Sequence, residues 1–275
     1  MASKMKSKKT GNSSEYEKEG AIVFLDILGF KGIWAKESPD EIFKRIKKIK
    51  DNYYMTERLF KMAEKIDEEQ GVQDDGMHNP EITFISDTII IEAEGDDDFV
   101  TFILSLSGLI QDTFYEFLKQ KLPLRGAISF GKYSRRENIF IGPAVDDVAE
   151  WYEKANWMGV ILTPKTTILL KSKIHDKEII EHEGGGFPIK NRLLKYPVPC
   201  KNLVDKECKR ELYALNWPWY VKTYPEICGG NKNPNTYGMI LEMLSEIGNI
   251  SPSVFDKYEN TIRFVKKCLE IEEKQ

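Results

Sequence analysis

The sequence is poor in the side chains that most often build zinc sites and hydrolytic triads. Among 275 residues there are only three histidines and four cysteines. No histidine lies in an apolar strand beside a nucleophile-like residue, and the cysteines, all between positions 200 and 268, show no metal-type spacing. Zinc chemistry and triad hydrolysis are therefore weak explanations of this chain. We interpret the cysteines as reduced thiols of a cytoplasmic protein.

Long hydrophobic runs and a strong charge of one sign are also missing. No apolar stretch approaches the roughly 20 residues that cross a bilayer. The formal net charge of -4 gives no indication of binding to nucleic acid or to an anionic membrane. We therefore expect neither a nucleic acid nor a membrane as a partner. Residues 1–19 are polar and lysine-rich, without the apolar core of a signal peptide, which predicts a disordered leader.

The most informative stretch that is present runs from Ala21 to Phe30. It is an apolar, β-prone run interrupted by one carboxylate, Asp26, and closed by Gly29. Such a run predicts a strand that is buried on both faces. Asp26 then lies at or just past the end of the strand, where a charge is costly without a positive partner. Taken alone, Asp26 fits a helix cap or a turn residue equally well.

A second acid, Asp87, lies between two β-rich runs over residues 81–92. This pattern predicts a hairpin with Ser86 and Asp87 at its tip. If the hairpin lies beside the first strand, the carboxylates of Asp26 and Asp87 meet at one edge of the sheet. Two such carboxylates repel each other unless a cation joins them. An all-oxygen ligand set suits Mg²⁺ or Mn²⁺ better than zinc.

The rest of the first two thirds predicts alternating helices and strands. A helix is predicted from Ser38 to about residue 69, and the basic run over 44–50 fits its solvated face better than a nucleic-acid site. Its apolar side is predicted to contain Phe43, Ile46, Ile49 and Tyr53. In chain order there follow a helix that residues 95–98 cap and that runs to about residue 119, strands over 122–131 and 138–142, a helix over 143–155, a strand over 160–162 and a helix from 163. This order predicts an α/β sandwich with a mainly antiparallel sheet flanked by helices.

The chain changes character after about residue 192. We expect a main domain over residues 20–191 and a mostly helical C-terminal appendage over 192–275, with helical patterns at 232–246 and 251–273. The appendage holds an aromatic cluster that fits core packing better than a base-stacking platform. The cluster consists of Tyr213, Trp217, Trp219 and Tyr220.

Four segments occur in a familiar order. They read Phe24-Leu25-Asp26-Ile27-Leu28-Gly29-Phe30, Ser86-Asp87-Thr88, Leu124-Arg125-Gly126-Ala127-Ile128-Ser129-Phe130-Gly131 and Gly142-Pro143-Ala144-Val145-Asp146. This ordered set resembles the class III nucleotide cyclases and, more narrowly, the pyrimidine cyclases of bacterial Pycsar antiphage systems. The resemblance covers roughly residues 20–165 and rests on the set rather than on any one motif.

The resemblance implies a site with two metal ions, Mn²⁺ or Mg²⁺. Asp26 and Asp87 align with the aspartates that hold both ions over a nucleoside triphosphate. The backbone after the first aspartate would cradle the triphosphate, with the carbonyl of Ile27 also reaching metal. That backbone comprises Ile27, Leu28, Gly29, Phe30 and Lys31. Active sites of related enzymes lie between two chains, which implies a homodimer with composite sites.

The departures from the family pattern concern the base and the transition state. Purine-specific members usually carry a lysine where this chain has Thr83, and often an acid where it has Ile139. Both purine-reading groups are thus missing, which agrees with a pyrimidine substrate. The helix that should offer an Asn and an Arg to the transition state offers Asp146 and Glu150, and Arg125 is the leading candidate to replace them. Arg125 fits a surface strand residue paired to an acid equally well.

These observations leave several functions open. The first is a pyrimidine cyclase that makes cyclic UMP from UTP, or cyclic CMP from CTP, as an antiphage second messenger that activates a separate effector. The second is a catalytically degenerate cyclase-like domain that acts as a nucleotide sensor. The third is another metal-dependent nucleotidyl transferase, such as a polymerase or a dinucleotide cyclase, although the sequence has no Gly-Gly-Asp/Glu-Glu-Phe signature.

Overall fold

The computed structural model describes most of the chain. The described residues are 17–30, 33, 36–53, 77–95, 98–174, 179–180, 187–201, 210–224, 235–247 and 251–270. Residues 1–16 of the predicted leader lie outside them. The last three residues of that segment, from Glu17, belong to the first strand instead.

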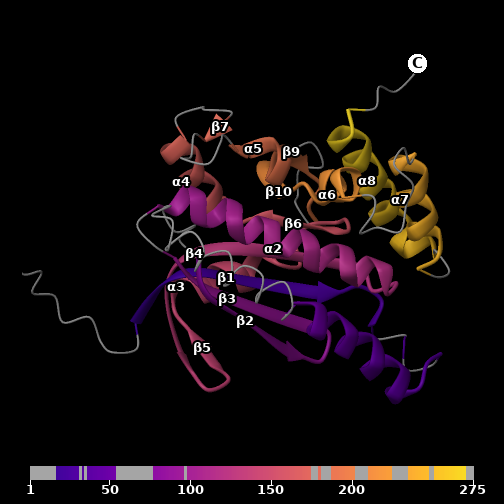
Figure 1. The fold of residues 1–275 in the computed structure, drawn as a ribbon, viewed down its shortest axis with the longest axis horizontal. Coiled ribbons are helices and arrows are strands. Elements are labelled where there is room, and N and C mark those ends of the chain that lie inside the picture. The colour runs from indigo at the N-terminus through magenta and orange to yellow at the C-terminus, as the bar shows by residue number, and fades with distance from the viewer. Residues whose placement is uncertain are drawn as a thin grey trace, which may run out of the picture.

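Eight strands form one sheet, and two more form a small pair (Figure 1). The strands are β1 (Glu17–Ile27), β2 (Met77–Ile85), β3 (Thr88–Gly95), β4 (Leu124–Arg136), β5 (Ile139–Ile141), β6 (Gly159–Leu162), β7 (Ile179–Ile180), β8 (Phe187–Pro188), β9 (Leu193–Val198) and β10 (Arg210–Leu215). The order across the main sheet is β2-β3-β1-β4-β6-β10-β9, and β5 pairs with β4. Only the β4–β6 pairing in this sheet is parallel. The predicted mainly antiparallel sheet is confirmed.

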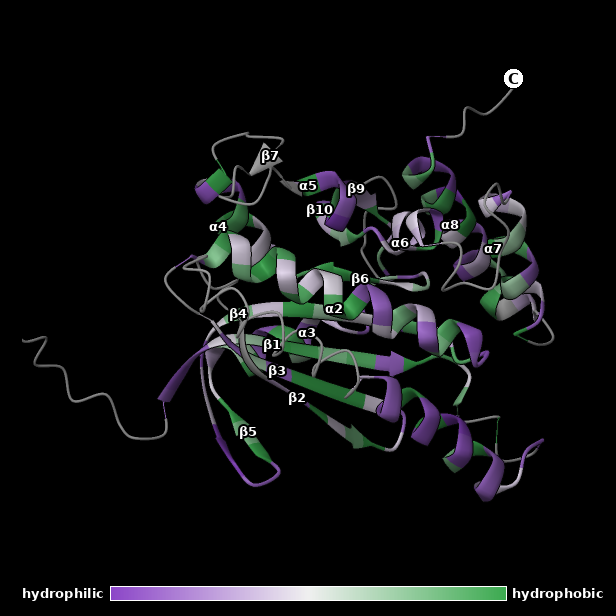
Figure 2. Cartoon of the chain, in the orientation of Figure 1, coloured by the Kyte–Doolittle hydropathy of each residue, from purple (hydrophilic) through white to green (hydrophobic). Residues whose placement is uncertain are grey.

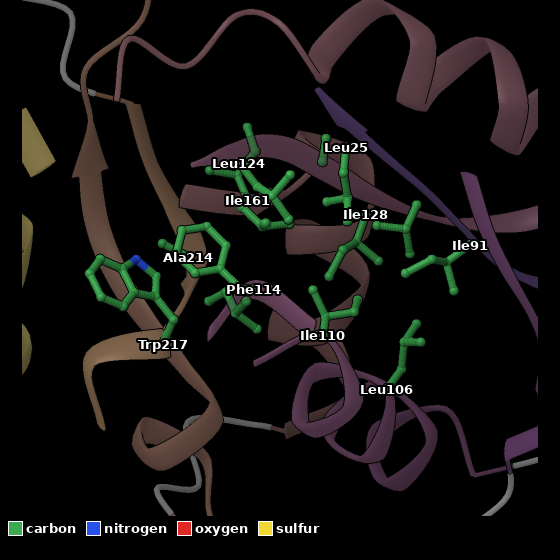
Figure 3. Close-up of a cluster of buried hydrophobic side chains, with 14 of the residues drawn as sticks. Leu25, Ile91, Leu106, Ile110, Phe114, Leu124, Ile128, Ile161, Ala214 and Trp217 are labelled. Atoms are coloured by element: carbon green, nitrogen blue, oxygen red, sulfur yellow. The ribbon is translucent and has the colours of Figure 1, made fainter. Parts of the chain in front are cut away.

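Helices cover both faces of this sheet. They are α2 (Phe99–Lys119), α3 (Pro143–Trp151), α4 (Pro164–Ile174), α5 (Ile189–Arg192), α6 (Trp217–Thr223), α7 (Thr236–Ser245) and α8 (Pro252–Cys268). Neighbouring strand residues point to opposite faces. Leu25 of β1 accordingly faces the α2 side (Figure 3), while Phe24 packs edge-on against Tyr152 at the end of α3 on the other side. The α/β sandwich flanked by helices is therefore the observed fold class.

The main core lies between the sheet and α2. Figure 3 shows Leu25, Ile91 and Ile128 of the sheet facing Leu106 and Ile110 of α2. All five side chains are buried. In Figure 2, β1 and β3 are coloured mostly hydrophobic, in contrast to the mixed colouring of α8. Burying β1 on both faces explains why its sequence is a nearly continuous apolar run.

Helices α2 and α3 both begin with residue types that commonly start helices. Asp98 is the N-cap of α2, and its carboxylate accepts hydrogen bonds from the backbone N–H groups of Val100 and Thr101. Gly95, which the sequence assigned to the cap, belongs to β3 instead. Pro143 occupies the first turn of α3, where its missing N–H is no loss. No helix within the described residues has the length and apolarity needed to span a membrane.

The predicted helix from Ser38 is helical over residues 39–53, and its remainder lies outside the described residues. Ile49 and Tyr53 are buried as expected, but Phe43 is 67% exposed, so its prediction as a core residue is wrong. Ile42 takes the core position, because residues 42, 46, 49 and 53 follow the helical period more closely than a series that begins at 43.

The sheet continues past the boundary predicted at residue 192. β9 and β10 both lie beyond it and join the main sheet through β6. The core is also continuous there, because Phe114 of α2 stacks on Trp217 at 5.0 Å between ring centroids (Figure 3). Tyr213, Trp217 and Tyr220 are buried, which confirms that these aromatic residues pack in the core.

Candidate functional site

Asp26 lies one residue before the end of β1, directly opposite Arg125 on β4. Residues paired in this way present their side chains on the same face. The Arg125 guanidinium donates from Nη2 to Asp26 Oδ2 at 2.5 Å. Asp26 is 9% exposed and Arg125 is 4% exposed. The sequence prediction that Asp26 needs a positive partner is therefore confirmed, and Arg125 is a buried residue rather than a surface strand residue.

The ion pair leaves hydrogen-bonding capacity unused on both partners. Arg125 Nε and Nη1 are buried and have no hydrogen-bond partner among the residues that the structure describes. Asp26 Oδ1 accepts no hydrogen bond from the part of the chain that the structure describes. Buried donors without a partner are costly, on the order of 1–3 kcal/mol each. This cost indicates that an anionic or strongly accepting group belongs beside Arg125.

Asp87 lies in the predicted hairpin turn between β2 and β3. Residues 85 and 88 pair across this turn, and Ser86 has a positive φ of 57°, which tightens it. β3 pairs with β1, and the Ile27 N–H donates to the Asp87 carbonyl oxygen at 2.8 Å. The backbones of the two aspartate segments are thus adjacent at one edge of the sheet, as the sequence predicted. Among the described residues, the Asp87 carboxylate makes no hydrogen bond or ion pair.

The chain turns sharply directly after β1. Gly29 has a φ of +81°, a left-handed conformation that favours glycine. The Leu28 N–H donates to the Pro123 carbonyl oxygen at 2.8 Å, which fixes the turn to the entry of β4. Leu28, Gly29 and Phe30 line a cavity of about 340 Å³. Lys31, the last residue of the predicted phosphate cradle, lies outside the described residues.

Two lysines that the sequence did not single out lie in the electrostatic field of the ion pair. Lys201 follows β9, and Lys257 lies on α8. Burial lowers the pKa of both lysines, and the Arg125 guanidinium lowers it further. Asp26 acts in the opposite direction on each. No sequence signal marked them, because they lie in the segment predicted as an appendage.

Tyr152 is the third unpredicted neighbour. Burial raises the pKa of its hydroxyl, and Glu153 and Asp26 raise it further. Its ring packs edge-on against Phe24, two residues before Asp26, at 5.6 Å between centroids. Tyr152 therefore closes the α3 side of the site with a neutral side chain.

Two acids of α3 stand where the family pattern has an Asn and an Arg that stabilise the transition state. Both lie on the protein surface. Asp146 and Glu150 are both exposed on α3. The inward-facing acid of this helix is Asp147, which accepts hydrogen bonds from the hydroxyls of Ser129 and Thr163, both at 2.6 Å. Asp147 thus joins α3 to the sheet and has a structural role.

The two positions that the sequence connected with base selection are far less buried than the ion pair. Thr83 is half-buried on β2 and pairs with Ile90 of β3. Ile139 begins β5 and is 65% exposed. Neither position carries a charged group.

The donor set at this edge fits hard divalent cations. Within the described ranges no group of three or more His, Cys, Asp or Glu side chains surrounds a metal position. Asp26 and Asp87 supply carboxylates, and Ile27 supplies a backbone carbonyl. Mg²⁺ is commonly held by one or two carboxylates together with substrate phosphates, rather than by a complete protein cage. The free Oδ1 of Asp26 and the unpaired Asp87 carboxylate suit that arrangement.

Comparisons with known proteins give similarity of structure but not of sequence. Neither a protein-family model nor a curated protein matches the chain. The adenylyl cyclase CyaB from P. aeruginosa is similar with a TM-score of 0.43 and 14% identity over 72% of this chain and 94% of that one. The guanylate cyclase domain of RhGC from Catenaria anguillulae, in complex with GTP, is similar with a TM-score of 0.42 and 14% identity over 72% and 97%. A bacterial light-regulated adenylyl cyclase gives 0.41 and 15% over 84% and 99%. These scores are too low to assign an activity to this chain.

Proposed function

We propose that this protein is a metal-dependent pyrimidine nucleotide cyclase that converts UTP to 3′,5′-cyclic UMP and pyrophosphate. CTP, which would give cyclic CMP, is the alternative substrate. The observation that carries the proposal is the buried Asp26–Arg125 pair beside the Asp87 turn. Two carboxylates that could hold metal ions and a guanidinium with unused donors belong to the same end of these strands. The turn that follows Asp26 lines a cavity.

Asp26, Asp87 and the carbonyl of Ile27 are the groups that would hold Mn²⁺ or Mg²⁺, two ions per site. When bound, such ions lower the pKa of the ribose 3′-hydroxyl and neutralise charge on the phosphates. Asp26 is only 9% exposed. Its charge therefore acts in a medium of lower dielectric constant than water, where its attraction for a cation is stronger.

Arg125 would bind a phosphate oxygen of the substrate. Its Nη2 is engaged with Asp26, which fixes the orientation of the guanidinium plane, while the buried Nε and Nη1 have no hydrogen-bond partner among the described residues. A guanidinium held in this way suits the charge that develops on the α-phosphate, because its donors need no reorganisation during the reaction. Arg125 thereby replaces the cation that the exposed Asp146 and Glu150 of α3 do not supply.

The turn after β1 would take the phosphate chain. Gly29 gives backbone amides close access to a ligand, since no side chain covers the turn at this position. Phosphates are well suited to backbone amides in such turns. In the reaction, a bond forms between the ribose 3′-oxygen and the α-phosphorus, and the bond from that phosphorus to the β-phosphate oxygen breaks. The 3′-hydroxyl proton is released to solvent and pyrophosphate leaves.

The choice of a pyrimidine rests on Thr83 and Ile139. Both stand where related purine cyclases usually carry a charged residue, and neither offers a charge to a purine edge. A binding site without such groups loses selectivity for a purine. The preference for UTP over CTP follows the resemblance to the Pycsar cyclases, which also suggests that the product is an antiphage second messenger acting on a separate effector.

A homodimer with composite sites is part of this proposal. Its support in the structure is the β4–β5 hairpin, where Ile139 and Ile141 are 65% and 62% exposed. Exposed large apolar side chains on a projecting hairpin suit a contact with a second copy. Asp26 and Arg125 nevertheless belong to the same chain, so the partner's contribution comes from other residues.

The proposal is tested by product analysis. Purified protein is incubated with Mn²⁺ and each of UTP, CTP, ATP and GTP, and the products are identified by mass spectrometry. Cyclic UMP together with pyrophosphate is the expected result, with weaker or no product from the purines. Absence of a cyclic product from both pyrimidine triphosphates would contradict the proposal.

A nucleotide sensor is the second candidate, and one observation favours it. Arg125 already neutralises Asp26, so the site is electrostatically balanced without a cation. A sensor would bind UTP or CTP without forming a cyclic product. Binding measured by calorimetry, with no product by mass spectrometry, would support the sensor.

A further inference from the structure

We infer that Lys257 of α8 binds the phosphate chain of the substrate, so that a helix from the C-terminal third completes the site within the same chain. This inference rests on the proposed function and names a further binding residue for it. It also gives a role to residues beyond 192, whose function the sequence left open.

Hydrogen bonds hold α8 against the segment that leads into β6. The Met158 N–H donates to Thr261 Oγ1 at 2.9 Å, and that hydroxyl donates in turn to the Lys257 carbonyl oxygen at 2.6 Å. Met158 immediately precedes Gly159, which pairs with Arg125 across the β4–β6 register. A short series of hydrogen bonds and strand pairs therefore connects Lys257 with Arg125.

Aromatic packing holds the same helix in place. Phe264 of α8 lies 4.5 Å from the ring of Trp157 and 4.9 Å from the ring of Tyr196, both measured between centroids. Phe264 and Trp157 are fully buried. Asn260 adds a hydrogen bond from its side-chain amide to the Asn156 carbonyl oxygen at 2.9 Å. Lys257 is thus presented by a rigid element, which suits a binding residue.

Lys257 lines the cavity of about 340 Å³ together with the turn at Leu28 and Gly29. Three other cations line this cavity: Lys36 is exposed to solvent, and the remaining two have partners. Arg45 is paired with Glu37, and Lys121 lies 3.3 Å from Glu246. Lys257 is half-buried and has no carboxylate within 4.0 Å among the described residues. Asp26 and Glu153 favour its charged form from a distance, but Lys257 forms no ion pair with a described residue.

The charge balance around Lys257 favours an anion. Burial and the nearby Arg125 guanidinium both lower the pKa of Lys257, which means that its ammonium form is disfavoured in the free protein. Independently, Arg125 is 4% exposed and has two buried donors without partners. A phosphate group in the cavity would give a counter-charge to Lys257, and its negative charge would also attract the Arg125 guanidinium, which acts on Lys257 although it does not line the cavity. Its oxygens are the strong acceptors that such donors prefer.

Inorganic tripolyphosphate in a Mg²⁺ buffer is a suitable probe, because it has no base, no ribose and no reaction to undergo. Its affinity is measured by isothermal titration calorimetry for the wild-type chain and three variants. Lys257→Ala should weaken binding about 10-fold or more, the usual loss for a hydrogen bond to a charged group. Lys257→Arg should stay within about threefold, because it keeps the charge. Lys267→Ala removes the same charge from an exposed position on the same helix and should leave binding unchanged.

The outcomes separate this inference from the proposed function. If Lys257→Ala binds tripolyphosphate as tightly as the wild type and Lys267→Ala do, or if the wild type does not bind it, the inference is overturned whatever the cyclase assay gives. If binding depends on Lys257 but none of the four triphosphates gives a cyclic product, the phosphate site stands and the proposed activity fails. Thermal melting of each variant shows whether the fold is retained.

Discussion

Strand β4 carries arginines near both ends, and two of them, Arg125 and Arg135, are used differently. Arg135 bonds to the carboxylates of Glu81 and Glu92 and donates from Nε to the Glu137 carbonyl oxygen at 2.9 Å. Its guanidinium also lies 5.1 Å from the centroid of the Phe140 ring. Arg125 has one partner, Asp26, and two buried donors with none.

The difference separates a closed ion pair, in which the partners satisfy the guanidinium, from an open one, in which buried donors are left without a partner. Although burial alone would lower it, the pKa of Arg135 is raised by hydrogen bonds with Glu92 and Glu81. Its partners on β2 and β3 satisfy the group, so it links β4 to two strands that are not its direct neighbours in the sheet. Arg125 is more deeply buried and less satisfied, which is a costly arrangement unless a further ligand arrives. Unused donors, rather than burial or pairing alone, therefore distinguish Arg125 from Arg135, and the proposed function assigns the role in the site to Arg125.

The largest expected effect is at the acid of the open pair. Asp26→Asn keeps an oxygen acceptor for Arg125 but removes the charge that would hold the cations. Loss of metal-assisted stabilisation should lower cyclic product formation about 10³-fold. The measurement is the initial rate of cyclic UMP formation with Mn²⁺, with circular dichroism as the check on folding. A rate within about tenfold of the wild type would show that Asp26 does not hold metal.

The next effect distinguishes the two arginines directly. Arg125→Gln should lower the rate about 10²-fold, the size of effect expected when one preorganised donor to developing charge is removed. Arg135→Gln is the matched control on the same strand and should keep the rate within about threefold. Equal losses in the two variants would erase the distinction between the open and the closed pair.

For stability we expect the reverse order, with a larger loss in Arg135→Gln than in Arg125→Gln. Glu92 is 4% exposed, and Arg135→Gln leaves its carboxylate buried without a cation. The free energy of unfolding should fall by about 2 kcal/mol, because an uncompensated buried charge remains. Urea denaturation measures it. A change below about 0.5 kcal/mol would show that solvent already screens Glu92.

The smallest effect is a pH dependence at the lysines of the site. Burial lowers the pKa of Lys257, so part of it is neutral in the free protein just below the ordinary lysine value of about 10.4. An anionic ligand restores the charged form, so binding of tripolyphosphate should take up a fraction of a proton, increasingly as pH rises towards that value. Calorimetry in buffers of different ionisation enthalpy measures the uptake, and Lys257→Arg should reduce it. Proton release would contradict the inference.

Local signals account for the part of the site that the sequence predicted. The strand containing Asp26, the turn at Gly29 and the hairpin tip at Asp87 each depend on residues close along the chain. The cap at Asp98 is local in the same way. Their adjacency followed from one further step, the pairing of the hairpin with the first strand.

The features that the sequence did not predict depend on contacts between distant residues. Asp26 and Arg125 were both candidates, but their pairing was not predicted, because they are 99 positions apart and the β1–β4 register brings them face to face. Lys257 lies further along still, in a segment whose strands β9 and β10 were not recognised as part of the sheet. Phe43 was misplaced for a different reason, since a shift of one residue along an amphipathic helix turns a side chain by about 100°.

Binding of Mn²⁺ in the presence of a non-cyclising UTP analogue that lacks the 3′-hydroxyl tests the central claim most directly. Electron paramagnetic resonance reports bound Mn²⁺ without any need for turnover. Wild-type protein and Arg135→Gln should show bound Mn²⁺ that depends on the nucleotide, while Asp26→Asn should lose most of it. Equal Mn²⁺ binding by Asp26→Asn and the wild type would contradict the account of a metal site at this edge of the sheet.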